Sequence, residues 1–400
     1  MFQCHDDLLR NDTNYTHDDV KTALVHLEQE ELLYKVPTFI YLSFLLLVGI
    51  PGNIVVCVIY LKLPPSTPRR FIVALALFDL LNCLVGIPFE IADLITDYFL
   101  DIPTLCRLVR MSNTFSSSGS IFILLIISVD RYRKICRPFR RQILVNDSTK
   151  CIYVITGFAG LTSIPAVIVY GRHSLYIRGL QTYDCSFDDS FSEYMFPKLY
   201  QICLALVCVI AIVVLILLYT FIVLKIVKQK KRRATLTSGA RQAAAAARAG
   251  NAPERGTDTT NSDTLPSRSD SPPEKSHADK SSTRKDTKKR TNNFIRSSRM
   301  TLMMLAVTVV FILGYMPHLG LQITRQILSS EFTDSLHCNH VGLAFYAFFL
   351  RSYFLNSAVN PIIYSCYNKR FRQECVTLLK RLMCQKTEAE TINTVTDSES

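Results

Sequence analysis

The chain has 400 residues, of which 49% are hydrophobic and 20% charged, and its formal net charge is +12. This length and composition leave two classes, a large soluble protein or a membrane protein, and the distribution of the apolar residues decides between them. The basic residues cluster beside apolar stretches, so the positive charge requires no nucleic-acid partner.

Seven apolar stretches have the length of a membrane span, since about 20 residues of helix cross ~30 Å of hydrocarbon. Because lipid satisfies no backbone hydrogen bond, such stretches predict an all-α membrane protein, a seven-transmembrane helix bundle. Small residues from 116 to 120 let neighbouring helices approach the third span closely, which predicts a central position for it. The stretches cover residues 34–61, 71–95, 108–129, 151–170, 202–227, 300–322 and 341–364.

The loops between the spans differ in charge. Lys and Arg fill the loops after spans one, three and five, whereas the alternate loops carry Asp and Glu. Because basic loops remain in the cytosol, we expect an extracellular amino terminus and a cytosolic carboxyl terminus in a multi-pass plasma-membrane protein.

The segments outside the spans differ in character. Residues 1–33 form an acidic extracellular tail with glycosylation sequons at Asn11 and Asn14. Residues 229–293 contain almost no large apolar side chain, which predicts a disordered third cytosolic loop between the transmembrane blocks 34–228 and 294–365. Apolar residues at helical spacing predict an amphipathic juxtamembrane helix at 366–384 on the membrane lipid, followed by a cytosolic tail, 385–400.

Two groups of ionisable residues lie within or at the end of spans. Asp79 lies in the middle of the second span, and Asp130-Arg131-Tyr132 ends the third. Charges in a membrane are costly unless they are paired or used, so both groups indicate functional sites. The histidines form no metal-ligand pattern, and no catalytic constellation is present, so we do not expect an enzyme.

Several residues and motifs follow one another in a fixed order on successive spans. In that order and placement they resemble the rhodopsin-like (class A) G-protein-coupled receptors, most closely the peptide-receptor branch. The resemblance covers nearly everything except the tails and the third inner loop. It is carried by Asn53, Leu75, Ala76, Asp79, Cys106, Asp130, Arg131, Tyr132, Pro138, Cys185, Tyr219, Phe311, Pro317, Asn360, Pro361, Ile362, Ile363, Tyr364 and Phe371.

The resemblance implies a disulfide between Cys106 and Cys185, and a contact between Arg131 and a heterotrimeric G protein. It also implies arrestin and receptor kinases as partners of the cytosolic tail, whose Thr and Ser residues are phosphorylation candidates. The residues implied in G-protein coupling and in the activation switch are Asp130, Arg131, Tyr132, Tyr219, Phe311, Tyr315, Pro317, Asn360, Pro361 and Tyr364.

A buried sodium site is also implied by the resemblance. One carboxylate with several neutral oxygens suits a small hard cation, which would be an allosteric ion and the chain's only expected cofactor. The alternative is a hydrogen-bonded network around a protonated Asp79. The residues concerned are Asp79, Ser120, Asn356, Ser357 and Asn360.

The chain also departs from the family pattern. It has no tryptophan, and Tyr315 stands where the sixth span usually carries one. The proline usual in the fifth span is replaced by Ala211. No acid lies at the inner end of the sixth span, so Asp130 alone is left to restrain Arg131. We therefore expect altered packing in the activation switch.

The extracellular ligand is the least constrained part of the interpretation. Asn113 stands where amine receptors have an aspartate, and Phe354 where opsins have the retinal lysine. Many polar groups at the outer ends favour a peptide, with a small-molecule chemoreceptor or a transporter as alternatives. The predicted ligand-binding residues are Glu90, Arg110, Asn113, His318, Gln322, Arg325 and Arg351.

The remaining cysteines lead to two further hypotheses. Cys4 and Cys338 lie on the oxidising side. They form a second disulfide, or Cys4 remains a free thiol in the tail while Cys338 is buried. Cys384 and Cys375 lie in or after the basic amphipathic segment, which makes them candidates for palmitoylation.

Overall fold

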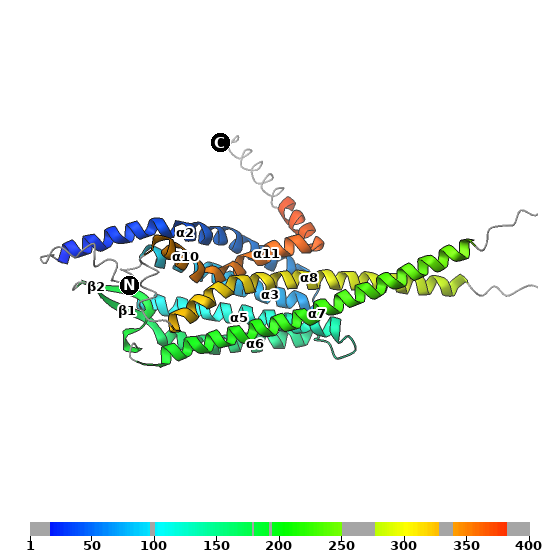
Figure 1. Ribbon diagram of the computed structural model, residues 1–400, viewed down its shortest axis with the longest axis horizontal. Coiled ribbons are helices and arrows are strands. Elements are labelled where there is room, and N and C mark those ends of the chain that lie inside the picture. Colours follow the sequence, from blue (N-terminus) through cyan, green and yellow to red (C-terminus); the bar gives the residue numbers. More distant parts are fainter. Residues whose placement is uncertain are drawn as a thin grey trace, which may run out of the picture.

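The computed structural model describes residues 17–96, 101–177, 180–191, 194–249, 277–327 and 339–381. Within these segments long helices run side by side along one axis, and a two-stranded hairpin lies at one end (Figure 1). The helices are α2 (His17–Lys62), α3 (Thr67–Leu81), α4 (Ile87–Ile95), α5 (Pro103–Cys136), α6 (Val145–Val169), α7 (Phe196–Ala249), α8 (His277–Ile327), α10 (His340–Leu350) and α11 (Leu355–Tyr367).

Six stretches of the described chain are helical, long and apolar enough to cross a membrane. The seventh span consists of α10 and α11, with 11 and 13 residues, joined by the 3₁₀ turn Ser352–Phe354. Each piece is too short to cross alone, so the break at Arg351 separates two halves of one crossing. Together with the family match given below, these helices confirm the predicted seven-helix membrane bundle.

The second span is also irregular. A π-helical turn, Asn82–Gly86, separates α3 from α4, and Pro88 follows in the first turn of α4. π-bulges and prolines both bend helices, so this turn and Pro88 together favour a bend in the second span. This turn brings the Gly86 backbone close to Asn113 of α5.

The hairpin pairs β1 (Tyr170–Ile177) with β2 (Leu180–Phe187) in antiparallel register, Arg172 opposite Cys185. A disulfide joins Cys185 to Cys106 with the Cα atoms 5.6 Å apart, which confirms the predicted bridge. We call this end of the bundle the hairpin end.

The hairpin has a second attachment to α5. Arg107 donates to Asp188 at 2.7 Å, and a Cβ at Gly171 would lie 2.1 Å from the same carboxylate. Burial opposes ionisation of Asp188, but hydrogen bonds from Ser190 and Arg107 outweigh it and hold its pKa below the usual range. The hairpin is therefore fixed over the bundle by a covalent bond and an ion pair.

Helices extend into two of the segments predicted to lie outside the spans. α2 begins at His17, inside the segment predicted as a tail of 33 residues. The predicted disorder from 229 to 293 is wrong for 229–249 and 277–293, where α7 and α8 continue away from the bundle (Figure 1). The alanines and basic residues there are strong helix formers, which favours continuation of the helix. The rest of that loop lies outside the described residues.

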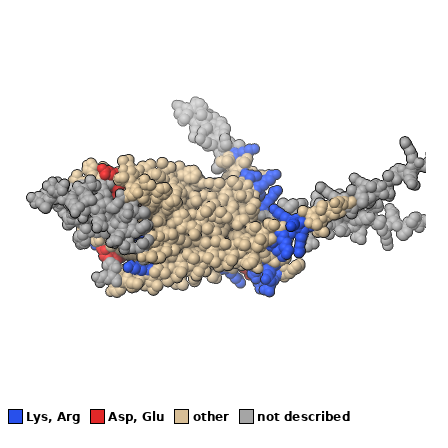
Figure 2. Space-filling model, in the orientation of Figure 1, with Lys and Arg blue, Asp and Glu red and all other residues tan. Residues whose placement is uncertain are grey.

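The charges divide along the long axis. Figure 2 shows Lys and Arg gathered at the end of the bundle opposite the hairpin, with a broad uncharged zone between the two ends. Exposed apolar side chains occupy that zone on α6 and α7, among them Leu161 and Ile210. An exposed apolar girdle of this kind is typical of a surface that faces lipid.

The predicted helix after the seventh span is present at residues 369–381. Its Phe371 is buried against Tyr60 and Tyr364, with ring centroids 5.7 and 6.3 Å apart. Asn368 donates to the Tyr60 hydroxyl at 3.0 Å where the chain turns into this helix. These contacts hold the helix against the bundle and leave Arg372 and Lys380 exposed.

Candidate functional site

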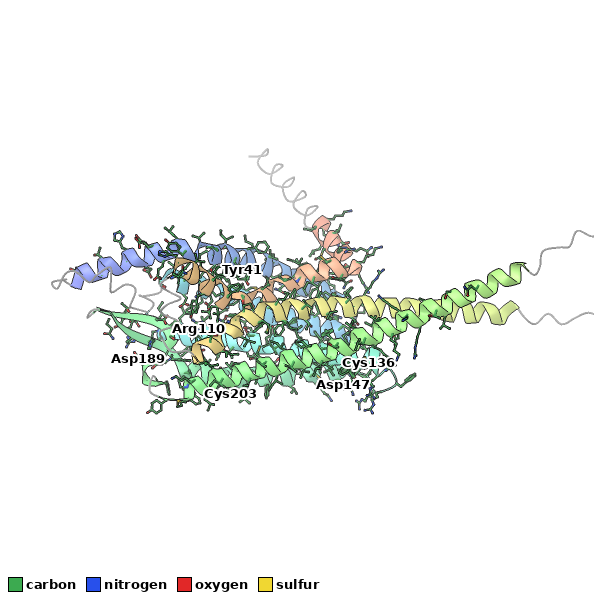
Figure 3. The ribbon with its side chains drawn as sticks, viewed as in Figure 1. Tyr41, Arg110, Cys136, Asp147, Asp189 and Cys203 are labelled. Carbon is green, nitrogen blue, oxygen red and sulfur yellow. A yellow bond between two sulfur atoms is a disulfide. The ribbon has the colours of Figure 1, made fainter. Side chains whose placement is uncertain are left out.

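A cavity of about 510 Å³ opens near the hairpin end between α5, α6, α7 and α8. Four of the predicted ligand-binding residues line it, namely Arg110, Asn113, His318 and Gln322. Ligand pockets commonly measure 300–1,000 Å³, so the volume suits a small ligand or the end of a peptide. In Figure 3 Arg110 lies next to the hairpin, on the side toward the centre of the bundle.

Glu90, Arg325 and Arg351, the other predicted ligand-binding residues, lie outside this lining. Arg325 is exposed near the end of α8. Glu90 and Arg351 are buried beside the cavity and form an ion pair with each other at 2.9 Å. Their assignment as ligand contacts stays a prediction.

These two residues belong to a network of four charges that joins α4, α5 and the seventh span. Arg110 pairs with Glu90 at 2.8 Å and with Asp93 at 3.5 Å. Arg351 reaches Asp93 at 3.4 Å. Two carboxylates thus face two guanidinium groups, and Arg110 also donates to the Cys185 carbonyl at 3.3 Å.

Asn113 lies deeper in the cavity. Its side chain is buried, and neither Oδ1 nor Nδ2 has a hydrogen-bond partner in the described part of the chain. The Gly86 backbone and the Asn82 amide lie beside it. Asn82 differs because its Nδ2 donates to the Ser357 hydroxyl at 3.0 Å.

Aromatic rings form one wall of the cavity. Tyr353 lies 4.6 Å from His318 and 5.9 Å from Tyr315, measured between ring centroids. His318 Nδ1 donates to the Leu350 carbonyl at 2.6 Å, which fixes the orientation of its ring. On the opposite side Gln201 donates to the Tyr170 hydroxyl at 3.3 Å.

Below the cavity, Asp79 is fully buried. It accepts from Ser120 at 3.1 Å and from Asn360 at 2.7 Å, and the described residues provide no cationic side chain as its ion-pair partner. Asn356 Oδ1 is buried without a hydrogen-bond partner in that same part of the chain. One carboxylate, a hydroxyl and an orphaned amide oxygen fit the predicted sodium ion.

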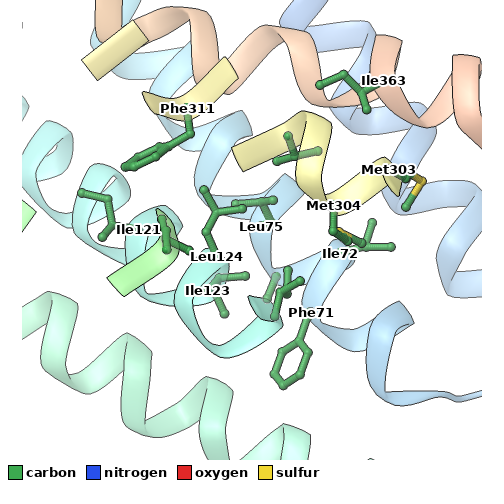
Figure 4. Close-up of a cluster of buried hydrophobic side chains, with 14 of the residues drawn as sticks. Phe71, Ile72, Leu75, Ile121, Ile123, Leu124, Met303, Met304, Phe311 and Ile363 are labelled. Atoms are coloured by element: carbon green, nitrogen blue, oxygen red, sulfur yellow. The ribbon is translucent and has the colours of Figure 1, made fainter. Parts of the chain in front are cut away.

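Four residues of the predicted switch, Tyr219, Phe311, Tyr315 and Tyr364, belong to the large buried apolar cluster of the bundle, part of which is drawn in Figure 4. Phe311 is fully buried in this cluster with Ile121, and its ring lies 4.5 Å from that of Tyr315. Tyr315 also lines the cavity. Ala211 is buried in the same cluster, so a small side chain fills the place of the usual proline.

The Asp130-Arg131-Tyr132 motif lies at the far end of α5. Arg131 is buried and forms an ion pair with Asp130 on its own helix, while Lys134 reaches the same carboxylate at 2.9 Å. The rings of Tyr132 and Phe221 lie 6.4 Å apart. Pro317 and Pro361 lie inside α8 and α11, and Tyr219 and Tyr364 are buried in the core.

Several predicted sites fall outside the described residues. These are the sequons at Asn11 and Asn14, both cysteines of the second disulfide, Cys4 and Cys338, and the palmitoylation candidate Cys384. Cys375 is described and lies half-buried in the helix 369–381.

Sequence reasoning missed Tyr170, Gln201 and Tyr353 as cavity residues, and Asp93 as a member of the charge network. Asp93 lies one helical turn after Glu90, so both carboxylates are on the same face of α4. This spacing is the signal that could have predicted that they share the same arginine partners. The other three carry no such signal, because only the packing of the hairpin, α7 and the seventh span brings Tyr170, Gln201 and Tyr353 together.

The comparisons with known proteins agree with this geometry. The family model described as 7 transmembrane receptor (rhodopsin family) matches residues 52–364. Similar curated proteins are the RYamide receptor of Tribolium castaneum (32% identical over 31% of this chain and 34% of that receptor) and the human neuropeptide FF receptor 1 (33% over 32% and 30%). The rat type-1 angiotensin II receptor B is 36% identical over 36% of this chain and 41% of its own length. The chain thus spans only about a third of the length of the first curated relatives it matches.

Proposed function

We propose, since this chain belongs to the rhodopsin family of seven-transmembrane receptors, that it binds an extracellular peptide and activates a heterotrimeric G protein. One observation carries the proposal: α5 lines the cavity at one end with Asn113 and presents Arg131 at the other. A ligand and a G protein would therefore contact the same helix from opposite ends.

The orientation follows from the distribution of charge. Lys and Arg gather at the end that carries Arg131 (Figure 2), and basic loops remain in the cytosol. The hairpin end, with its disulfide, then faces the oxidising exterior of the plasma membrane. The same distribution supports an extracellular amino terminus and a cytosolic carboxyl terminus.

Three features favour a peptide over the alternatives. The relatives named above are receptors, two of which bear the peptide names RYamide and neuropeptide FF. The cavity is large enough for a few residues. Its neutral polar groups suit backbone amides, which donate and accept hydrogen bonds. A small-molecule chemoreceptor has no specific observation in its favour, and membership of a receptor family disfavours a transporter or an enzyme.

Arg131 would transmit the signal. Its ion pair with Asp130 keeps the guanidinium folded against α5, and activation would exchange this contact for one with the G protein. The absence of an acid at the inner end of the sixth span leaves this local pair as the restraint.

The test replaces Arg131 with alanine. We expect Arg131→Ala to abolish agonist-dependent nucleotide exchange on the G protein while surface expression remains near that of the wild type. Arg140→Ala, which removes an exposed arginine from the neighbouring loop, is the matched control and should signal normally. Normal exchange by Arg131→Ala would contradict the proposed function.

We further propose a sodium ion as an allosteric ligand at Asp79, with Ser120, Asn356, Ser357 and Asn360 as its other candidate ligands. The support is the buried carboxylate, which has hydroxyl and amide neighbours but no cationic partner within the described residues. A bound cation would offset the cost of burying the charge.

Modifications and further partners complete the proposal. Asn11 and Asn14 would be glycosylated outside the cell, and Cys384 and Cys375 palmitoylated at the inner leaflet. A bridge between Cys4 and Cys338 would draw the acidic tail over the cavity. Arrestin and receptor kinases would act on the cytosolic tail.

A further inference from the structure

The sixth and seventh spans meet where each of them is irregular. Pro317 lies inside α8, where it has no N–H to donate and its ring crowds the preceding turn. The seventh span breaks at Arg351, whose carbonyl accepts from the Phe354 amide at 3.2 Å. In an α-helix that amide would donate to Leu350, four residues back. Both breaks therefore leave backbone carbonyls open to side-chain donors.

Two hydrogen bonds cross between these breaks, and we call the pair the clasp. The Ser352 hydroxyl donates to the Gly314 carbonyl at 2.7 Å, and His318 Nδ1 donates to the Leu350 carbonyl at 2.6 Å. On α8 the two bonds lie on either side of Pro317. A Cβ on Gly314 would lie 3.2 Å from the Ser352 carbonyl oxygen, so the glycine lets the two backbones approach closely.

The two bonds differ in what can replace them. The Ser352 hydroxyl also lies 2.8 Å from the Phe349 carbonyl of its own span, so it keeps an acceptor if α8 moves away. Tyr41 of α2 donates to the Ser352 carbonyl at 3.0 Å and anchors this backbone. Nδ1 of His318 has no second acceptor among the described residues. Because a donor left without a partner loses more than one that changes acceptor, the His318 bond should contribute more to the clasp.

The clasp borders the ligand cavity. Tyr353 follows Ser352 in the chain, and its ring lines the cavity. Tyr315 follows Gly314 and also lines the cavity, as does His318. The Tyr353 ring lies 4.6 Å from His318 and 5.9 Å from Tyr315, measured between centroids. A group that enters between these rings therefore moves the backbone segments that form the clasp.

We infer that the clasp holds α8 against the seventh span in the resting receptor, and that a ligand between the two tyrosine rings opens it. Arg131 is paired with Asp130 in the same conformation, so the clasp coexists with the restrained state of the proposed function. Loss of the clasp should raise the population in which α8 has separated from the seventh span. His318 and Ser352 are thus positioning residues, because they act through the position of α8. The inference deepens the proposed function, on which its signalling consequence rests.

The experiment measures conformation and signalling separately, on the ligand-free, full-length receptor in lipid nanodiscs. For conformation, non-natural residues that carry spin labels replace the exposed Arg140 and Arg299. Arg299 lies 18 residues before Pro317, about 27 Å along the helix, so a bend of about 10° at the proline shifts it by roughly 5 Å. For signalling, binding of a non-hydrolysable GTP analogue is measured on purified heterotrimers of each G-protein class.

Two substitutions remove one bond each. His318→Phe keeps a ring beside Tyr353 but has no donor, and it should raise ligand-free exchange about threefold to tenfold, the range of one net hydrogen bond. Ser352→Ala should raise it by at most about threefold, because the wild-type hydroxyl has Phe349 as its other acceptor. The labels should show a larger separated population in the same order.

Two further substitutions separate the clasp from a general loss of packing. Gly314→Ala crowds the Ser352 carbonyl only while the spans are in contact, so it should raise both the separated population and exchange. Ser163→Ala is the matched control, because this buried serine donates within α6 to the Gly160 carbonyl at 2.8 Å. It should leave the label distances and exchange as in the wild type. A merely structural role for the clasp predicts lower thermal stability with unchanged label distances.

The outcomes separate the clasp from the proposed function. If His318→Phe and Gly314→Ala keep the wild-type label distances, the clasp is wrong, whatever exchange is measured. The same conclusion follows if Ser163→Ala shifts the labels as much as they do. If the labels shift as expected but no heterotrimer responds to any variant, the clasp stands and the proposed coupling to a G protein fails.

Discussion

The network of four charges at the hairpin end offers the most direct test of how the outer half of the bundle is held together. Glu90 contacts Arg110 at 2.8 Å and Arg351 at 2.9 Å, and the side chains of Glu90 and Arg351 are only 5% and 8% exposed. The substitution Glu90→Gln keeps the shape of the side chain and removes its charge. Two guanidinium groups would then share Asp93 alone, at 3.5 and 3.4 Å.

The expected loss of stability is large, because breaking a buried ion pair typically costs about 3–5 kcal/mol. In a thermal unfolding assay of the purified, ligand-free receptor this corresponds to a fall of roughly 5–15 °C. Arg172→Gln is the matched control, because Arg172 and Asp101 are 47% and 42% exposed at 3.5 Å. Such a pair contributes about 0–1 kcal/mol, so the control should melt near the wild type.

A double-mutant cycle tests the pairing itself. After Glu90→Gln, Arg351 has already lost one of its two carboxylate partners, so Glu90→Gln with Arg351→Gln should cost less than the sum of the two single changes. Additive costs, or a Glu90→Gln protein as stable as the Arg172→Gln control, would refute the view that these charges stabilise one another.

Two further changes test the core. Asp79→Asn should abolish any effect of sodium on agonist affinity, because the carboxylate carries the charge. Wild-type affinity that is the same at low and high sodium, with potassium balancing ionic strength, would exclude the ion. Gly119→Ala would bring a Cβ within 2.3 Å of the buried Phe78 ring and should cost about 1–3 kcal/mol in thermal unfolding, whereas Gly157→Ala meets no atom within 4 Å and should be neutral or stabilising. Equal stabilities for these two alanine variants would contradict the packing.

The spans were predictable because lipid imposes one requirement on every crossing segment. About 20 apolar residues are needed whatever the neighbouring helices are, so length and composition alone identified the seven stretches. The irregular turns were not predictable in this way. The π turn Asn82–Gly86 and the break at Arg351 depend on contacts with other helices, such as the bond from Ser352 to the Gly314 carbonyl at 2.7 Å.

The helical extensions were missed for a different reason. The lack of large apolar residues after 228 predicts disorder, since such a segment cannot bury a core. A helix that continues from a membrane span needs no new nucleus, and the alanines around 243–247 favour its propagation. The composition of this segment therefore predicts that it forms no apolar core, but it does not exclude a helix.

The candidate site was only partly predictable. The disulfide partners came from the family resemblance and were confirmed, and four of the seven predicted ligand residues line the cavity. The pairing of Glu90 with Arg351 was beyond sequence reasoning, because the two residues are far apart in the chain and meet only in the folded bundle. Glu90 and Arg351, two of the predicted ligand contacts, bind each other, which is what their opposite charges favour once both are buried.

The connection from the cavity toward Arg131 runs through side chains that both line the cavity and pack in the buried apolar cluster. Arg131 lies 18 residues beyond Asn113 on α5, about 27 Å at 1.5 Å per residue, so a ligand at Asn113 cannot reach it directly. Tyr315 lines the cavity and packs at 4.5 Å on Phe311, which is buried among the side chains of α5 and α7. A phenol fills less volume than the indole usual at this position, so the ring can shift without opening a large void. If a ligand displaces Tyr315, we expect Phe311 to move as well, because the two rings are in contact and both lie in the buried cluster.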